Sequence, residues 1–303
     1  MYQAEVQTSK RLLKLRDLAD ALEKVNVDKI IGQWESEAGI VLAEAQKEAI
    51  HASLKYGVFV LTGGPGTGKT TVIKGILAVL EKAGCRILLA APTGRAARRL
   101  ADSSGHPAVT VHRLLEYTPN GGGFNFGKND GDPLDADAII IDEASMLDIT
   151  LTYHLLKAVQ GGCRLIFVGD VDQLPSVGAG SVLKDIIRSQ KMPVVRLENV
   201  FRQAEISPIV RNAHRINRGQ MPEWEPSSDF TFVEIENEFD AAEYVANIYA
   251  RLTQQSDWQS VQVLSPMHKN PCGVQNLNHL LQQRINPPAV SYTHLTLPTN
   301  REV

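Results

Sequence analysis

The stretch GGPGTGKTT at 63–71 constrains the fold of this 303-residue chain more than any other feature. It satisfies the pattern G-x-x-x-x-G-K-[ST], and it lies between an apolar run at 58–62 and a segment of helical character. Glycines at these places let successive backbone N–H groups point into one concavity, and the following helix adds partial positive charge there. The alternative is a glycine-rich turn with a chance lysine, and both flanks count against it. The stretch predicts a nucleotide phosphate site formed by Gly63, Gly64, Pro65, Gly66, Thr67, Gly68, Lys69, Thr70 and Thr71.

A second segment, AIIIDEASMLD at 138–148, supplies the acidic groups that such a site needs. Its apolar strand ends in Asp142 and Glu143, at the carboxyl edge of the sheet where open α/β folds bind ligands. We expect Lys69 to contact the β- and γ-phosphates, and Thr70 and Asp142 to hold Mg²⁺. Glu143 is expected to orient or deprotonate the attacking water. An exposed acidic strand end is the alternative for this segment alone, but together the two segments predict Mg-ATP hydrolysis.

Short apolar runs alternate with helical segments along the chain, which is typical of an α/β protein with a parallel sheet covered on both faces. Helices are expected over 8–24 and 44–54, and the Gly-, Asn- and Asp-rich stretch at 118–135 is expected to be a surface loop. The predicted strands are 58–62, 86–91, 138–142, 164–169, 194–197, 230–235 and 261–265.

Composition narrows the class of protein without indicating a partner. The net charge is −3, so binding to nucleic acid would have to rely on local basic groups. The cysteines Cys85, Cys163 and Cys272 form no CxxC pair, which argues against a metal site or a disulfide framework. No apolar run approaches the ~20 residues of a membrane span and no signal peptide is evident, so we expect a cytoplasmic protein without membrane contact.

Further segments resemble the RecD-like branch of superfamily 1 DNA helicases. Gln46 in LAEAQKEAI matches the adenine-reading glutamine of these proteins, although alone it would be taken for a solvated helix residue. VGDVDQLPSVGAGSVLKDI at 168–186 resembles helicase motif III, which implies that Gln173 lies beside the γ-phosphate. FRQ at 201–203 resembles motif IV, and this implies a catalytic role for Arg202 across a domain cleft.

Two segments resemble the parts of these helicases that contact DNA. APTGRAARRL at 91–100 resembles motif Ia, whose Thr93, Gly94 and Arg95 would meet phosphates through a hydroxyl, a backbone N–H and a guanidinium. VHRLL at 111–115 resembles a segment that faces the strand, although a single histidine such as His112 is usually structural. The implied partner is single-stranded DNA, or a duplex with a single-stranded end, and 5′→3′ movement is implied by the resemblance only.

The resemblance covers roughly residues 40–288 and implies a P-loop NTPase fold with a RecA-like sheet and a second, incomplete RecA-like domain. The expected order is the helical end of an N-terminal region at 1–39, ATPase domain 1A at 40–193 and a partial domain 2A at 194–288. In the remaining stretch, AVSYTHLTLPTNREV at 289–303, the segment VSYTHLTLPT can be back-translated to a sequence that resembles a transposon-derived sequencing adapter, and we expect a non-native tail there. Motifs V and VI of the family are not found. We therefore expect a truncated gene fragment that binds nucleotide weakly and does not unwind DNA.

Two other classes of function stay open on the sequence. One is a P-loop ATPase that acts on proteins or small molecules, such as an AAA+ machine or a kinase. The other is a nucleotide-binding fragment without turnover. DNA-stimulated ATP hydrolysis separates the first from a helicase, and phosphate release measured beside nucleotide binding separates the second.

Overall fold

The computed structural model describes residues 1–18, 25–120, 123–197, 207–224 and 229–285. It divides the chain into two compact units, Met1–Glu223 (unit 1) and Trp224–Val303 (unit 2), of which unit 1 contains the sheet. The expected tail at 289–303 and the motif with Arg202 lie outside the described residues. Among those that are described, no helix is both long and apolar enough to cross a membrane.

Unit 1 is built around a six-stranded sheet in the order β3-β2-β6-β7-β1-β8, in which every neighbouring pair is parallel. All the carboxyl ends therefore meet at one edge, and the phosphate-binding stretch follows β1 there. The strands are β1 (Val58–Gly63), β2 (Ile87–Ala91), β3 (Ala108–Thr110), β6 (Ala138–Ile141), β7 (Arg164–Gly169) and β8 (Val194–Leu197).

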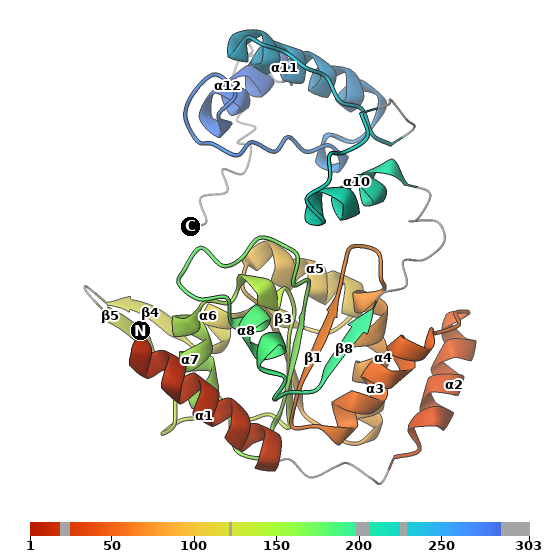
Figure 1. Ribbon diagram of the computed structural model, residues 1–303, viewed down its shortest axis with the longest axis vertical. Helices are drawn as coiled ribbons and strands as arrows, with labels where there is room; N and C mark the ends of the chain where they lie inside the picture. The colour runs from red at the N-terminus through yellow and green to blue at the C-terminus, as the bar shows by residue number, and fades with distance from the viewer. Residues whose placement is uncertain (19–24, 121–122, 198–206, 225–228, 286–303) are drawn as a thin grey trace, which may run out of the picture. The chain divides into compact units, whose positions relative to one another are not determined.

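Alternate strand residues enter two separate cores, one on each face of the sheet. Phe59 and Leu61 pack in one core, whereas Val58 and Val60 pack in the other. This two-sided burial explains why the strand sequences are continuous apolar runs. The first core is covered by α2 (Val27–Ala38), α3 (Glu44–Lys55), α4 (Lys69–Lys82) and α5 (Gly94–Ser104), and the second by α1 (Tyr2–Leu18), α6 (Val111–Leu114), α7 (Ile149–Ala158) and α8 (Val182–Ser189) (Figure 1).

The sheet corrects several expectations. The strand at 194–197 forms, but it pairs with β1 in parallel register, Val60 opposite Val194, and so belongs to the first sheet rather than to a second domain. The stretch 118–135, expected as a loop, contributes the antiparallel strands β4 (Tyr117–Asn120) and β5 (Gly123–Phe126), because Tyr117 and Phe126 bring aromatic rings to a shared cluster. The helix α1 also belongs with unit 1, since Leu12 and Leu15 are buried in its second core.

The part of unit 2 that the structure describes is helical. It contains α11 (Glu238–Gln255), the short 3₁₀ helix η2 (Trp258–Ser260) and α12 (Val274–Ile285), and Ala242, Ala246 and Leu277 are buried there. The expected strands at 230–235 and 261–265 are extended segments without sheet pairing. Their apolar residues are half-buried or exposed and none is fully buried, so the burial that a central strand needs is missing. The sheet of a second RecA-like domain is therefore not formed by the described residues of unit 2.

Candidate active site

The phosphate-binding stretch turns between β1 and α4 through two glycines in the left-handed region. Gly66 has φ 74° and Gly68, which precedes the first residue of α4, has φ 86°. A side chain at either place would be strained, so the motif's glycines are a requirement of the backbone. Gly63 is required for space, because an added Cβ would lie 2.6 Å from Thr67 Oγ1 and 2.9 Å from Leu197 O.

Lys69 folds back onto this stretch. Its Nζ donates hydrogen bonds to Gly63 O at 2.6 Å and to Gly64 O at 2.9 Å. Burial lowers the pKa of Lys69, and the nearby carboxylates, Asp170 foremost, oppose that shift. The ammonium group of Lys69 is thus held against the carbonyls of the loop, and its contact with the β- and γ-phosphates stays a prediction.

Two further side chains fix the shape of the loop. Thr67 is buried and donates to Gly64 O at 2.9 Å, which closes the turn. Gln46 is 2% exposed, so it is not a solvated helix residue: its Nε2 donates to Thr67 O at 3.3 Å and its Oε1 accepts from Ala43 N at 2.9 Å. The amide therefore joins the start of α3 to the phosphate loop. Pro65 is exposed, and Thr70 and Thr71 lie in the first turn of α4.

The acidic pair lies where β6 ends. Asp142 still follows the strand, since its N–H donates to Ala90 O at 2.9 Å, whereas Glu143 adopts a left-handed backbone with φ 51°. Burial is the main cause that raises the pKa of both carboxyl groups, and Lys69 opposes it in each case. One carboxylate oxygen, Glu143 Oε2, is enclosed without a hydrogen-bond partner among the described residues. Such an atom is uncommon in a folded protein.

The segment after β7 lies against this pair. Gly169 ends the strand, and a Cβ there would lie 3.2 Å from the backbone nitrogens of Ala144 and Ser145. Asp170 is buried and its Oδ1 accepts from Asp172 N at 3.0 Å, which shapes the following turn. Asp170 lies in the segment 168–186 and was not predicted as a site residue, although a carboxylate after a buried strand is the same signal that identified Asp142.

The residues predicted to contact DNA begin at the end of β2. Thr93 is the N-cap of α5, where its hydroxyl accepts from Ala96 N at 3.2 Å, and Gly94 is the first helical residue. Arg95 is exposed and lines a shallow hollow with Arg98, Arg99, Asp102 and Ser103. Arg99 is close enough to the nucleotide site to lower the pKa of both Asp142 and Glu143, a link that the sequence did not reveal. Basic groups thus extend from the active site along α5.

His112 lies away from these arginines in an aromatic cluster. Its ring is 5.5 Å from that of Tyr117 and 6.5 Å from that of Phe126, measured between centroids. Phe126 in turn stacks on His154 at 4.3 Å. This packing on β4, β5 and α7 agrees with the structural alternative for His112 and leaves its contact with DNA a prediction.

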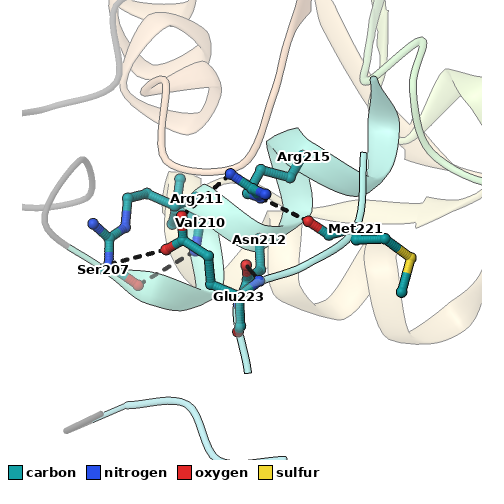
Figure 2. A network of polar contacts seen from close by, with 7 residues as sticks. All are labelled: Ser207, Val210, Arg211, Asn212, Arg215, Met221 and Glu223. Carbon is teal, nitrogen blue, oxygen red and sulfur yellow. Dashed lines mark hydrogen bonds and ion pairs between the residues drawn. The ribbon is translucent and has the colours of Figure 1, made fainter. Parts of the chain in front are cut away.

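The helix that follows the motif of Arg202 is α10 (Pro208–Asn217). Hydrogen bonds and ion pairs join its side chains to the segment 221–223 that follows the helix (Figure 2). Asn212 exchanges two hydrogen bonds with the backbone of Glu223, at 3.0 and 2.7 Å. Arg215 donates to Met221 O at 2.8 Å and to Glu223 Oε1 at 3.2 Å, and Arg211 lies 3.8 Å from Glu223 Oε2. These arginines thus have an acidic partner within their own unit.

Comparison with known proteins finds one family model and several curated relatives that match this chain. A family model described as an AAA domain matches residues 46–179. The chain is 41% identical over 246 residues to the ATP-dependent RecD2 DNA helicase of Deinococcus radiodurans, covering 81% of this chain and 33% of the relative. It is 44% identical over 167 residues to the RecBCD enzyme subunit RecD of Mycobacterium tuberculosis, covering 48% of this chain and 28% of that protein.

A solved structure of Pif1 helicase from Candida albicans aligns with 74% of this chain and 56% of its own, at 19% identity and a TM-score of 0.48. The chain spans about a third of the length of the curated relatives that it matches. Its phosphate loop, its acidic pair and the segment after β7 all fall within the matched residues. Over the residues that these relatives share with it, the chain belongs to the RecD-like family.

Proposed function

We propose that the chain is the motor part of an ATP-dependent DNA helicase or translocase, in which Mg-ATP hydrolysis is coupled to movement on single-stranded DNA. The observation that carries this proposal is the convergence of Lys69, Asp142, Glu143 and Asp170 at one sheet edge, beside the loop whose backbone forms the phosphate cradle. The relative from Deinococcus radiodurans, which is named a DNA helicase, supports the choice of DNA over a protein or small-molecule substrate.

The residues present fit Mg²⁺. The donors are oxygens, the hydroxyl of Thr70 and the carboxylate of Asp142, and Glu143 Oε2 has no partner among the described residues. No group of three or more His, Cys, Asp or Glu side chains in the described ranges is placed to hold a metal. Mg²⁺ is commonly held by one or two protein groups together with phosphates and water, a role that Thr70 and Asp142 would fill. When bound, Mg²⁺ neutralises charge on the phosphates.

The protein's own groups then perform distinct tasks. Lys69 leaves the carbonyls of Gly63 and Gly64 and binds the phosphates instead. Glu143 holds the attacking water and accepts its proton, and its raised pKa makes it a better base than an ordinary carboxylate. Gln46, Gln173 and Arg202 are proposed to contact the adenine and the γ-phosphate as their motifs imply.

Contact with DNA is proposed to run along α5. Arg95 is exposed in the first turn of α5. The hydroxyl of Thr93 and the first N–H groups of the helix lie at the same N-terminal end of α5. A guanidinium and a helix N-terminus both bind phosphates, so the contact should depend on salt but not on base sequence. The net charge of −3 agrees with a local rather than a global basic surface.

The test measures nucleotide binding and phosphate release on the same samples. Binding of a fluorescent ATP analogue with Mg²⁺ should be greatly weakened in Lys69→Ala and kept in Lys74→Ala, which alters an exposed lysine of the same helix. In a full-length protein that contains this motor, phosphate release should rise when single-stranded DNA is added and should stop in Glu143→Gln. Turnover without any response to DNA would favour an ATPase of another class, and binding without turnover would favour a nucleotide-binding protein.

A further inference from the structure

A serine two residues after Glu143 has no task in the mechanism above. Ser145 lies in the 3₁₀ helix η1 (Ala144–Met146), and its Oγ is enclosed without a hydrogen-bond partner among the residues that the structure describes. Enclosed hydroxyl groups nearly always have a partner, so this one indicates an interaction formed in another state of the protein.

The position of Ser145 is fixed from both sides. The left-handed backbone of Glu143 starts η1, and Met146 N donates back to Glu143 O at 3.0 Å. On the other side Gly169 packs on the backbone of Ala144 and Ser145, where an added Cβ would be 3.2 Å from each nitrogen. The end of β7 and the start of η1 are therefore closely packed, and the segment 170–173 begins at this contact.

Beside Ser145 lies a hollow of about 100 Å³ that Gln173 also lines. Its other lining residues are Val171, Pro175, Ser181, Leu183 and Lys184. The backbone of Gln173 is anchored, since its N–H donates to Asp170 O at 3.3 Å, whereas its side chain is exposed. A volume of this size admits a side-chain amide. A hydroxyl both donates and accepts, and an amide offers the matching groups.

We infer that the Ser145 hydroxyl is the hydrogen-bond partner of the Gln173 amide in the nucleotide-bound state, and that Ser145 is a positioning residue which links the hydrolytic carboxylates to the segment after β7. Gln173 is favoured over Lys184 because it lies in the turn that starts at Asp170, whose charge acts on Lys69. This inference rests on the proposed function.

The test is a double-mutant cycle in the affinity for a fluorescent oligothymidine, measured with and without Mg²⁺ and a non-hydrolysable ATP analogue. The quantity compared is the ratio of the two dissociation constants, which reports the coupling between the sites. Ser145→Ala and Gln173→Ala should each reduce this ratio by about five- to tenfold, the value of one neutral hydrogen bond. The double variant should reduce it no further than either single one. Ser145→Thr, which retains the hydroxyl, should restore it.

Ser181→Ala is the matched control, because Ser181 lines the same hollow and should leave the ratio unchanged. Additive effects of Ser145→Ala and Gln173→Ala would overturn the inference, as would a Ser145→Thr variant that behaves like Ser145→Ala. Non-additivity of Ser145→Ala with Lys184→Ala in place of Gln173→Ala would also overturn it. A wild-type chain whose DNA affinity ignores the nucleotide would refute the proposed function itself, so the two failures are distinguishable.

Discussion

The substitution Glu143→Gln should stop ATP turnover and at the same time stabilise the nucleotide-free protein. Burial, assisted by the charge of Asp142 and opposed by Lys69, raises the pKa of Glu143 in the folded state. A group whose pKa rises on folding stabilises the protein below its unfolded pKa and loses that contribution as the pH rises through the folded pKa. At pH 7 the ionised side chain therefore lowers the free energy of unfolding, and a neutral amide of the same size removes this cost.

The magnitude follows from the environment of the carboxylate. Glu143 Oε2 is enclosed without a partner in the described part of the chain, but the side chain as a whole is only half-buried. Solvent screening therefore places the gain at the lower end of the range for an unpaired buried group, about 1 kcal/mol. For a domain of this size that corresponds to an increase in Tm of about 2–4 °C.

The assay is thermal unfolding over a series of pH values, following the transition that responds to added nucleotide. The gap in Tm between Glu143→Gln and wild type should be largest near neutral pH and should close as the pH falls toward the ordinary carboxyl value of 4.5. Glu48→Gln, at an exposed position on α3, should show no gap at any pH. A Glu143→Gln variant that is no more stable than wild type at pH 7, or a gap independent of pH, would refute the reasoning.

Three further substitutions test the rest of the site. Lys69→Ala should weaken Mg-ATP binding by about ten- to a hundredfold, the value of a charge-assisted hydrogen bond, in equilibrium titration with a fluorescent analogue; an unchanged dissociation constant would remove the lysine from the site. Arg95→Ala should weaken binding to single-stranded DNA of any sequence and reduce the salt dependence by about one counterion, and an affinity that is steady from low to high salt would contradict phosphate contact. Gly169→Ala should lower the free energy of unfolding by about 1–3 kcal/mol in denaturant titration, because its Cβ would lie 3.0 Å from Leu183 and 3.2 Å from the backbone of η1. A neutral effect of that alanine would show that the end of β7 adapts more easily than its packing indicates.

The sequence predicted unit 1 well because its strong signals are local. A strand buried on both faces needs an uninterrupted apolar run, and the runs that start at Val58, Ala138 and Arg164 are β1, β6 and β7. The phosphate loop also depends on local chemistry, since Gly66 and Gly68 occupy backbone conformations that other residues rarely adopt. Both kinds of signal can be recognised in the sequence without knowing which residues lie nearby in the folded structure.

What the sequence could not supply depends on contacts between distant segments. The run at 194–197 has no mark that distinguishes a sixth strand of the first sheet from the first strand of a second one, and only its pairing with β1 decides. The aromatic cluster that orders β4 and β5 includes His154 of α7, far along the chain. Likewise the enclosed hydroxyl of Ser145 and the influence of Arg99 on the carboxylates arise from side-chain placement.

The hold of Gly63 and Gly64 on the ammonium group of Lys69 has a consequence for how the protein responds to nucleotide concentration. If the loop binds a triphosphate as proposed, the phosphates compete with the carbonyls of Gly63 and Gly64 for the Lys69 ammonium group. Binding would then include an exchange, in which the carbonyls lose a cation as the phosphates gain one. The reverse exchange would assist release of the product, because the ammonium group can return to the carbonyls. Substitutions that displace the carbonyls of Gly63 and Gly64 would thus change the rate of product release as well as the rate of nucleotide binding. A slow release of product would then be a property of the loop and not of the hydrolysis step.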